Sequence, residues 1–411
     1  MSVPLSTLLP PFARIGLMSF GGPAAQIALM HKVLVDERGW LTERQFLNAL
    51  SFCMLLPGPE AMQLATFAGW RLAGIGGGLL AGALFVLPGA LVMLALAAGY
   101  ATYGEVPLVS AVFLGIKAAV LVIVFQALLK IAARALARRA HWALAIAAFV
   151  ALFFVALPYP LIVLAAAAIG AVLGGTRVEA APPRLDLART GLVLALGLAL
   201  WLGPLFLLDG ILAEIGMFFA KLAVVTFGGA YAVLAWVAQD AVTALGWMTP
   251  GEVLDGLGLA ETTPGPLILV TQFVGFLAAF REGGLWLGAA GAGVALWATF
   301  VPCFLWIFAG APYIDWISAQ PRLSGALSGV TAAVVGVVAN LSLWFGLHVF
   351  FGTVTQQGFG PLVLWVPDPA TLDPVVVALA AVSAVLLLGL RVGLGWTLLA
   401  MAGLGLGASL I

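Results

Sequence analysis

Long blocks of apolar residues, separated by short polar connections, run through the whole chain. A membrane-spanning helix needs about 20 largely apolar residues, and most of these blocks reach that length. The blocks are continuous rather than alternating, which favours helices over the strands of a barrel. We therefore expect thirteen membrane segments in the sequence: 12–31, 46–70, 74–100, 106–133, 141–157, 159–175, 190–208, 212–237, 254–278, 284–310, 323–350, 374–390 and 392–410.

The composition excludes a soluble globular protein. Hydrophobic residues make up 64% of the 411 positions and charged residues only 8%, against about 25% charged residues in ordinary soluble proteins. Such a chain cannot cover a water-facing surface, so the prediction is an all-α polytopic membrane protein whose partners include membrane lipids.

The charged residues, cysteines and histidines do not indicate a nucleic-acid-binding protein, a metalloprotein or an enzyme. The 17 basic and 17 acidic residues balance, and no basic patch is large enough for nucleic acid. Cys53 and Cys303 lie far apart, and the three histidines are scattered, so no metal site or cofactor is expected. Clustered carboxylates or histidines of the kind an enzyme uses are also absent from the sequence, and we assign no catalytic residue.

The sequence contains an internal repeat. FARIGLMSFGGPAA at 12–25 matches FAKLAVVTFGGAYA at 219–232, an offset of 207, and Pro57-Gly58-Pro59 matches Pro264-Gly265-Pro266 at the same offset. Further on, GIKAAVLVIVFQ at 115–126 matches GVTAAVVGVVAN at 329–340, an offset of 214. The repeat predicts two six-helix units, 1–175 and 212–411, joined by a linker and one extra helix at 176–211.

The number of spans between equivalent positions sets the orientation of the second repeat. Seven segments separate them, and an odd number inverts the second copy, as in many secondary transporters. If the first segment of each half were only re-entrant, the two copies would be parallel.

Basic residues favour the inverted arrangement, because Lys and Arg accumulate in cytoplasmic loops. With thirteen spans, eleven basic residues share the N-terminal side and four lie opposite, and the re-entrant alternative gives nine and six. We therefore expect the N-terminus in the cytoplasm and the C-terminus outside. The eleven are Arg14, Arg71, Lys130, Arg134, Arg138, Arg139, Arg177, Arg184, Arg189, Arg322 and Arg391.

Four segments are interrupted by Gly and Pro near mid-membrane. We name them break 1 (Ser19–Pro23), break 2 (Leu55–Glu60), break 3 (Thr226–Gly229) and break 4 (Thr262–Pro266). Unwound backbone is tolerated in hydrocarbon only where it faces protein or a water-filled cavity. The half-helix that starts after each break presents free N–H groups and about +0.5 of an elementary charge at its N-terminus, which suits an anion.

The predicted anion site therefore surrounds the four breaks. Each kind of break is repeated at one offset, which argues against ordinary Gly and Pro enrichment in membrane helices. Its expected substrate-binding residues are Ser19, Gly21, Gly22, Pro23, Gly58, Pro59, Gln63, Lys117, Thr226, Gly228, Gly229, Thr262, Thr263, Gly265 and Gln272.

Charged residues inside spans are costly and are often functional. Lys117 has no carboxylate in its own span, so it either pairs with a distant acid such as Glu60 or Glu261 or meets a substrate anion. Arg14 and Lys221 are repeat equivalents, and for both an interface-anchor role competes with a coupling role. Glu60 either caps a half-helix or joins Glu261 as a candidate proton carrier.

The breaks and their surroundings are familiar from a known family. FARIGLMSFGGPAAQIALM, CMLLPGPEAMQLATFAGW, KLAVVTFGGAYAVLAWVAQ and GWMTPGEVLDGLGLAETTPGPLILVTQFVGFLAAF resemble the chromate ion transporter family. The resemblance covers nearly the whole chain and fits the long, two-domain bacterial members. It implies an exporter of chromate in the bacterial inner membrane that is driven by the membrane gradient and confers chromate resistance. The C-terminus would then lie in the periplasm.

Other functions remain open on the sequence. A transporter of sulfate or another oxyanion, as importer or antiporter, would share the anion site, and an anion channel would use the same helix ends without alternating access. No GxxxxGK[ST] loop occurs, so nucleotide-driven transport is not expected. A homodimer is one option for the assembly.

Overall fold

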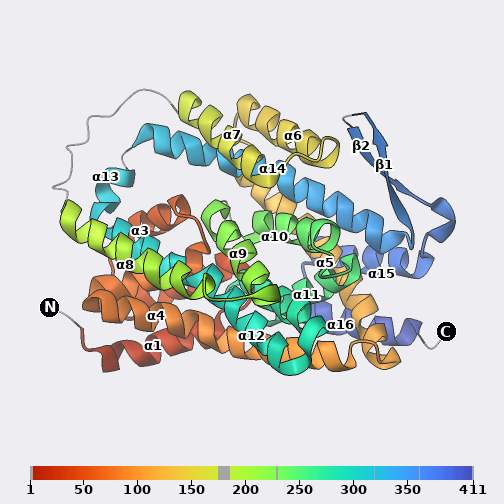
Figure 1. Ribbon diagram of the computed structural model, residues 1–411, viewed down its shortest axis with the longest axis horizontal. Coiled ribbons are helices and arrows are strands. Elements are labelled where there is room, and N and C mark those ends of the chain that lie inside the picture. Colours follow the sequence, from red (N-terminus) through yellow and green to blue (C-terminus); the bar gives the residue numbers. More distant parts are fainter. Residues whose placement is uncertain (1–2, 175–185, 228–229, 319, 361, 410–411) are drawn as a thin grey trace. The chain divides into compact units, whose positions relative to one another are not determined.

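The computed structural model describes residues 3–174, 186–227, 230–318, 320–360 and 362–409, which are almost entirely helical (Figure 1). The first half contains α1 Leu5–Met18, α2 Gly22–His31, η1 Lys32–Glu37, α3 Glu43–Leu55, α4 Glu60–Tyr103, α5 Pro107–Ala135, α6 Arg139–Phe153 and α7 Tyr159–Leu173. The rest contains α8 Leu187–Leu205, α9 Gly210–Val225, α10 Ala230–Gln239, η2 Asp240–Ala244, α11 Pro250–Thr262, η3 Leu267–Leu269, α12 Val270–Gly310, η4 Ala311–Tyr313, α13 Ile314–Ser318, α14 Pro321–Phe350, η5 Pro369–Thr371, α15 Pro374–Ala384, η6 Val385–Gly389 and α16 Leu394–Ala408.

The helices confirm a polytopic membrane protein. Among the described residues, five helical segments are long and apolar enough to cross a bilayer: Glu60–Tyr103, Pro107–Ala135, Ala188–Leu205, Leu267–Tyr313 and Pro321–Phe350. Large apolar side chains such as Val172, Leu207 and Trp286 are more than four-fifths exposed, at 84%, 84% and 86%. Side chains of this kind are stable on a surface that lipid covers. The expected total of thirteen spans stays a prediction.

The two longest helices are each two helices joined at a kink. In α4 the backbone leaves helical geometry at Ala73 (φ −143°, ψ 28°) and Gly74 (φ 66°, ψ −156°). In α12 it does so at Gly283 (φ −148°, ψ 19°) and Gly284 (φ 71°, ψ −160°), with nearly the same angles. Both kinks fall where a short interval between two expected spans ends and the next expected span begins, at residues 73–74 and 283–284.

Helix α3 and helix α11 begin in the same way. Thr42 and Gln45 form a capping box at the start of α3, each side chain accepting a hydrogen bond from the other's backbone N–H. At the start of α11, the Thr249 N–H donates to Glu252 Oε2 (2.7 Å) and the Glu252 N–H donates to Thr249 Oγ1 (3.3 Å). The two boxes lie 207 residues apart, so equivalent sequences in the two halves start helices by one mechanism.

The chain forms two compact units, and each draws on both halves of the sequence. Unit 1 comprises 1–98, 171–230 and 259–325, and unit 2 comprises 99–170, 231–258 and 326–411. The expected division at 175 and 212 concerns the repeat and stays a prediction; much of the linker lies outside the described residues.

In unit 1, α12 packs against α8 and α9. Pro302 lies inside α12 and lacks the N–H that would pair with the Ala298 carbonyl. The indole Nε1–H of buried Trp201, on α8, donates to that carbonyl oxygen at 2.9 Å. The extra helix therefore satisfies a backbone group that a helix-interior proline leaves free.

In unit 2, α5 packs against α15 and α16 (Figure 1). The small side chains of Ala118 and Ala119 on α5 are buried in one apolar cluster with Leu379 of α15 and Leu398 of α16. The packing puts the middle of α5, where Lys117 lies, inside the unit.

One element of unit 2 was not expected from the sequence. Strands β1 Val354–Phe359 and β2 Leu362–Pro367 form an antiparallel hairpin between α14 and α15. The Val363 N–H donates to the Phe154 carbonyl oxygen (2.7 Å), which ties the hairpin to the turn after α6. This hairpin is an addition to the expected all-α fold, which the other described elements confirm.

Candidate functional site

All four predicted breaks interrupt helices, and they lie in unit 1. Helix α1 ends at Met18 and α2 begins at Gly22; α3 ends at Leu55 and α4 begins at Glu60. Helix α9 ends at Val225, before α10 at Ala230, and α11 ends at Thr262, before η3 at Leu267. Two candidate residues of break 3, Gly228 and Gly229, lie outside the described residues.

The breaks join crosswise through backbone hydrogen bonds. The Gly58 N–H of break 2 donates to the Thr226 carbonyl oxygen of break 3 at 2.8 Å. The Gly265 N–H of break 4 donates to the Ser19 carbonyl oxygen of break 1, also at 2.8 Å. Residues 58 and 265, and residues 19 and 226, are repeat equivalents. The first break of each half is therefore hydrogen-bonded to the second break of the other half.

Gly58 and Gly265 have positive φ values, +121° and +92°, which are unfavourable for residues that carry a side chain. A Cβ on Gly58 would lie 2.8 Å from Cys303 Sγ and 2.9 Å from Gln63 Nε2, whereas one on Gly265 would lie 3.3 Å from the Phe85 carbonyl oxygen. Glycine is required at these positions by both the conformation and the space.

The hydroxyl groups in the breaks support the helix ends. Ser19 Oγ and Thr226 Oγ1 are buried and donate to the carbonyl oxygens four residues earlier, Ile15 and Leu222, at 2.6 Å each. Thr262 Oγ1 and Thr263 Oγ1 both donate to the Leu259 carbonyl, at 2.9 and 2.7 Å. These hydroxyls stabilise the ends of α1, α9 and α11, and their protons are already committed to backbone acceptors.

Three buried glutamines hold the unwound backbone. Gln26 Nε2 donates to the Gly265 carbonyl oxygen at 2.6 Å, and Gln63 Nε2 donates to the Pro57 carbonyl at 2.7 Å. Gln272 Nε2 donates to the Ala90 carbonyl at 3.0 Å. The Oε1 atoms of all three are buried and have no hydrogen-bond partner within the described part of the chain. Gln26 was not among the predicted site residues, although it bridges breaks 1 and 4.

The charged candidates fall into two groups. Arg14 Nη1 pairs with Glu37 Oε2 at 2.8 Å, where the side chains are 46% and 34% exposed, and Lys221 is also exposed. Exposed pairs contribute little stability, and this placement favours the interface-anchor role for both basic residues. Glu60 is half-buried at the first position of α4, and Glu261 is buried on the last turn of α11. The coupling role of all four stays a prediction.

Lys117 has a partner that was not expected from the sequence. Its Nζ lies 3.2 Å from Asp255 Oδ2, and Asp255 was not one of the two acids named as candidate partners. Tyr100 Oη donates to the same carboxylate oxygen at 2.7 Å. The Asp255 side chain is 2% exposed and that of Lys117 is 31% exposed, so Lys117 is the more accessible residue of the pair. All three residues lie in unit 2.

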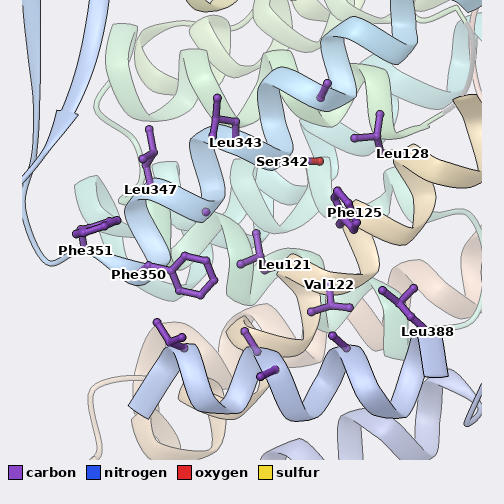
Figure 2. Close-up of a pocket in the computed structure, with 16 residues that line it drawn as sticks. Leu121, Val122, Phe125, Leu128, Ser342, Leu343, Leu347, Phe350, Phe351 and Leu388 are labelled. Carbon is purple, nitrogen blue, oxygen red and sulfur yellow. The ribbon is translucent and has the colours of Figure 1, made fainter. Parts of the chain in front are cut away.

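A cavity of about 620 Å³ in unit 2 does not suit an oxyanion (Figure 2). Its walls come from α5, α14 and α15 and are almost wholly apolar. The hydroxyl of its polar residue Ser342 donates to the Val338 carbonyl oxygen at 2.8 Å. A dianion placed there would lose its hydration without gaining donors, which is costly.

The comparisons with known proteins agree on one family. The profile of the chromate transporter family matches residues 7–171 and 213–406. A chromate transport protein from Pseudomonas aeruginosa is 34% identical over 354 residues, covering 82% of this chain and 80% of that protein. One from Cupriavidus metallidurans (strain CH34) is 32% identical over 338 residues, covering 82% and 81%. A probable chromate transport protein from Synechococcus elongatus is 29% identical over 393 residues, covering 93% and 95%.

No solved structure matches the chain. The profile, however, spans both halves, and the chain aligns with most of the length of the matched relatives. The chain belongs to the chromate transporter family.

Proposed function

We propose that this protein is a secondary transporter that exports chromate from the cytoplasm across the bacterial inner membrane and so confers chromate resistance. The observation that carries the proposal is the crosswise pairing of the four breaks, Gly58 with Thr226 and Gly265 with Ser19. A half-helix that begins directly after a break carries free N–H groups and a positive end at its N-terminus, which suits an oxyanion. The names of the relatives supply chromate as the anion.

The membrane potential favours export over uptake. A dianion that leaves a cell with an inside-negative potential of 100 mV gains about 4.6 kcal/mol, twice the value of about 2.3 for one charge. Uptake of the same dianion would need co-transported cations. We therefore propose that the membrane gradient drives export through its electrical component, the membrane potential.

Transport of sulfate is the second candidate function, because sulfate has the same charge and tetrahedral shape. Its uptake would need a coupling cation, for which the acids Glu60 and Glu261 are the candidate carriers. An anion channel is a weaker alternative, because it would not need paired, discontinuous helices from both halves.

Flux in liposomes that contain only this protein tests the proposal. We expect chromate to leave vesicles with an inside-negative potential at a rate that rises with the potential. Sulfate should compete less well. Fast sulfate flux with no chromate flux would favour the second candidate, and chromate flux that is the same at every potential would refute export driven by the potential.

We further propose that the two halves are inverted repeats within thirteen spans. The matched kinks of α4 and α12 and the matched capping boxes of α3 and α11 support the repeat. Cysteine labelling in a background without Cys53 and Cys303 should place residues near 136 and 182 in the cytoplasm and residues near 360 outside. Residues 182 and 360 on the same side would contradict the inversion.

A further inference from the structure

One face of α11 is shaped to bring α5 close. Gly251, Asp255 and Gly258 follow one another at helical spacing and so lie on the same side of the helix. A Cβ on Gly251 would lie 3.2 Å from Lys117 Nζ, and one on Gly258 would lie 2.4 Å from Ile116 Cγ2. The two glycines leave room for α5, and this close approach places the Lys117 ammonium against the Asp255 carboxylate.

The two oxygens of the Asp255 carboxylate differ in their hydrogen-bond partners. Oδ2 accepts a hydrogen bond from Tyr100 Oη (2.7 Å) and lies 3.2 Å from Lys117 Nζ. Oδ1 is buried and has no hydrogen-bond partner in the described ranges. Leaving a buried carboxylate oxygen without a donor is costly, so the cluster is adapted to a second state in which Oδ1 carries a proton or faces a ligand.

The charges around Asp255 show what that second state requires. Lys117 faces it from α5, Tyr100 faces it from α4, and Glu252 lies one turn earlier on α11, where its carboxylate caps the helix at Thr249. The ammonium and the Asp255 carboxylate now neutralise each other. A proton on Asp255 leaves the Lys117 cation without its counter-charge, and in a low-dielectric interior that cation attracts an anion.

We propose that Tyr100, Lys117 and Asp255 form a proton-linked anion subsite, in which a proton taken up by Asp255 releases Lys117 and Tyr100 to bind an oxyanion such as chromate or sulfate. The protonated state offers three donors to the oxyanion: Lys117 Nζ, Tyr100 Oη and the carboxyl O–H of Asp255. The inference deepens the proposed transport function and rests on it. Each dianion that binds is accompanied by one proton, so the loaded subsite carries one negative charge less.

The subsite belongs to one half of the repeat alone. The residues equivalent to Lys117 and Asp255 are Thr331 and Asn48, at offsets of 214 and 207. Neither residue carries a charge, and Thr331 Oγ1 donates to the Leu327 carbonyl oxygen at 2.8 Å. The proton linkage therefore operates at one site per chain rather than at two.

Calorimetric binding of sulfate and of chromate to the purified full chain, over a series of pH values around neutrality, tests the proposal. For the unaltered protein, one linked proton makes the affinity rise by about tenfold for each unit that the pH falls. Titrations in buffers with different ionisation enthalpies should count about one proton taken up per anion. The number of protons taken up per anion is measured on the unaltered protein. It therefore tests the proton linkage even if a variant fails to fold.

Two variants and a control separate the roles. In Asp255→Asn, Lys117 has lost its counter-charge permanently, so the anion should bind with an affinity that no longer depends on pH. Lys117→Gln should lower the affinity by more than about a hundredfold. Glu105→Gln changes an exposed acid in the same unit and should leave the pH dependence as it was.

The two levels of the proposal fail separately. Anion binding without proton uptake, or an Asp255→Asn variant with the original pH dependence, would overturn the subsite, while chromate flux in liposomes would still support export. Proton-linked sulfate binding in a protein that moves no chromate would support the subsite and refute chromate export.

Discussion

Replacing Gly58 by leucine is expected to reduce chromate flux to the rate of vesicles without protein. The new Cβ would approach Cys303 Sγ to 2.8 Å and Gln63 Nε2 to 2.9 Å, and the φ of +121° opposes any side chain. Overpacking costs about 1–3 kcal/mol and a disfavoured φ about as much again. The chain can avoid these costs by moving break 2, which breaks the Gly58–Thr226 hydrogen bond that joins the two halves.

The equivalent glycines should show a graded effect. A Cβ on Gly265 would meet the Phe85 carbonyl oxygen at 3.3 Å, and one on Gly22 would meet nothing within 4 Å. We therefore expect the loss of flux to be largest for Gly58→Leu, smaller for Gly265→Leu and smallest for Gly22→Leu, where the φ of +78° supplies the strain alone. Flux through purified, reconstituted variants measures this order.

Gly293→Leu is the matched control, because Gly293 lies on α12, is exposed, and has open space where a Cβ would point. It should insert in the membrane and transport as the unaltered protein does. Normal flux in two of the three break variants, with correct insertion, would mean that the breaks serve packing alone.

The positions of the breaks could be predicted because their signal is local. Proline removes a backbone donor and glycine permits unusual angles, so the FGG and PGP segments mark the ends of half-helices wherever they lie. Their recurrence at one offset distinguished them from ordinary glycines and prolines. The crosswise pairing could not be predicted, because Gly58 and Thr226 are far apart in the sequence and no sequence pattern states which break meets which.

The partner of Lys117 illustrates the same limit. The sequence left two alternatives for Lys117, a distant acid such as Glu60 or Glu261 and a substrate anion. The salt bridge is formed by Asp255, in the middle of α11. One signal was present: Gly251 and Gly258 flank Asp255 on one helix face, and small residues mark close helix approach in membranes. The identity of the approaching helix, α5, required the fold.

The hairpin at 354–367 was missed for a different reason. The segment 362–367, LVLWVP, is apolar and only a short connection separates it from the apolar helix α15, so it resembles the edge of a span more than a strand. Its strand character depends on pairing with β1 and on the Val363–Phe154 hydrogen bond, which are contacts made in the folded chain.

Replacing Lys117 by glutamine is expected to destabilise the protein by about 3 kcal/mol, at the low end for a buried pair because the Lys117 side chain is 31% exposed. Glutamine cannot neutralise the Asp255 carboxylate, which is 2% exposed and keeps the Tyr100 hydroxyl as its side-chain donor. The thermal unfolding temperature of the purified variant, compared with that of the unaltered protein at one neutral pH, measures the loss.

Neutralising both partners should restore that stability. In the double variant Lys117→Gln/Asp255→Asn, no buried charge is left without a partner, and amide side chains of similar size can still hydrogen-bond with each other and with Tyr100. Removing both members of a buried pair is often nearly neutral, whereas removing one is costly, because the penalty comes from the charge left behind. We therefore expect the unfolding temperature of the double variant to return close to that of the unaltered protein. Asp255→Asn alone should lose less than Lys117→Gln, since the Lys117 side chain is 31% exposed and retains access to its surroundings. If Lys117→Gln unfolds at the original temperature, or if the double variant is no more stable than Lys117→Gln, the two residues do not stabilise each other, and the salt bridge has no part in holding α5 against α11.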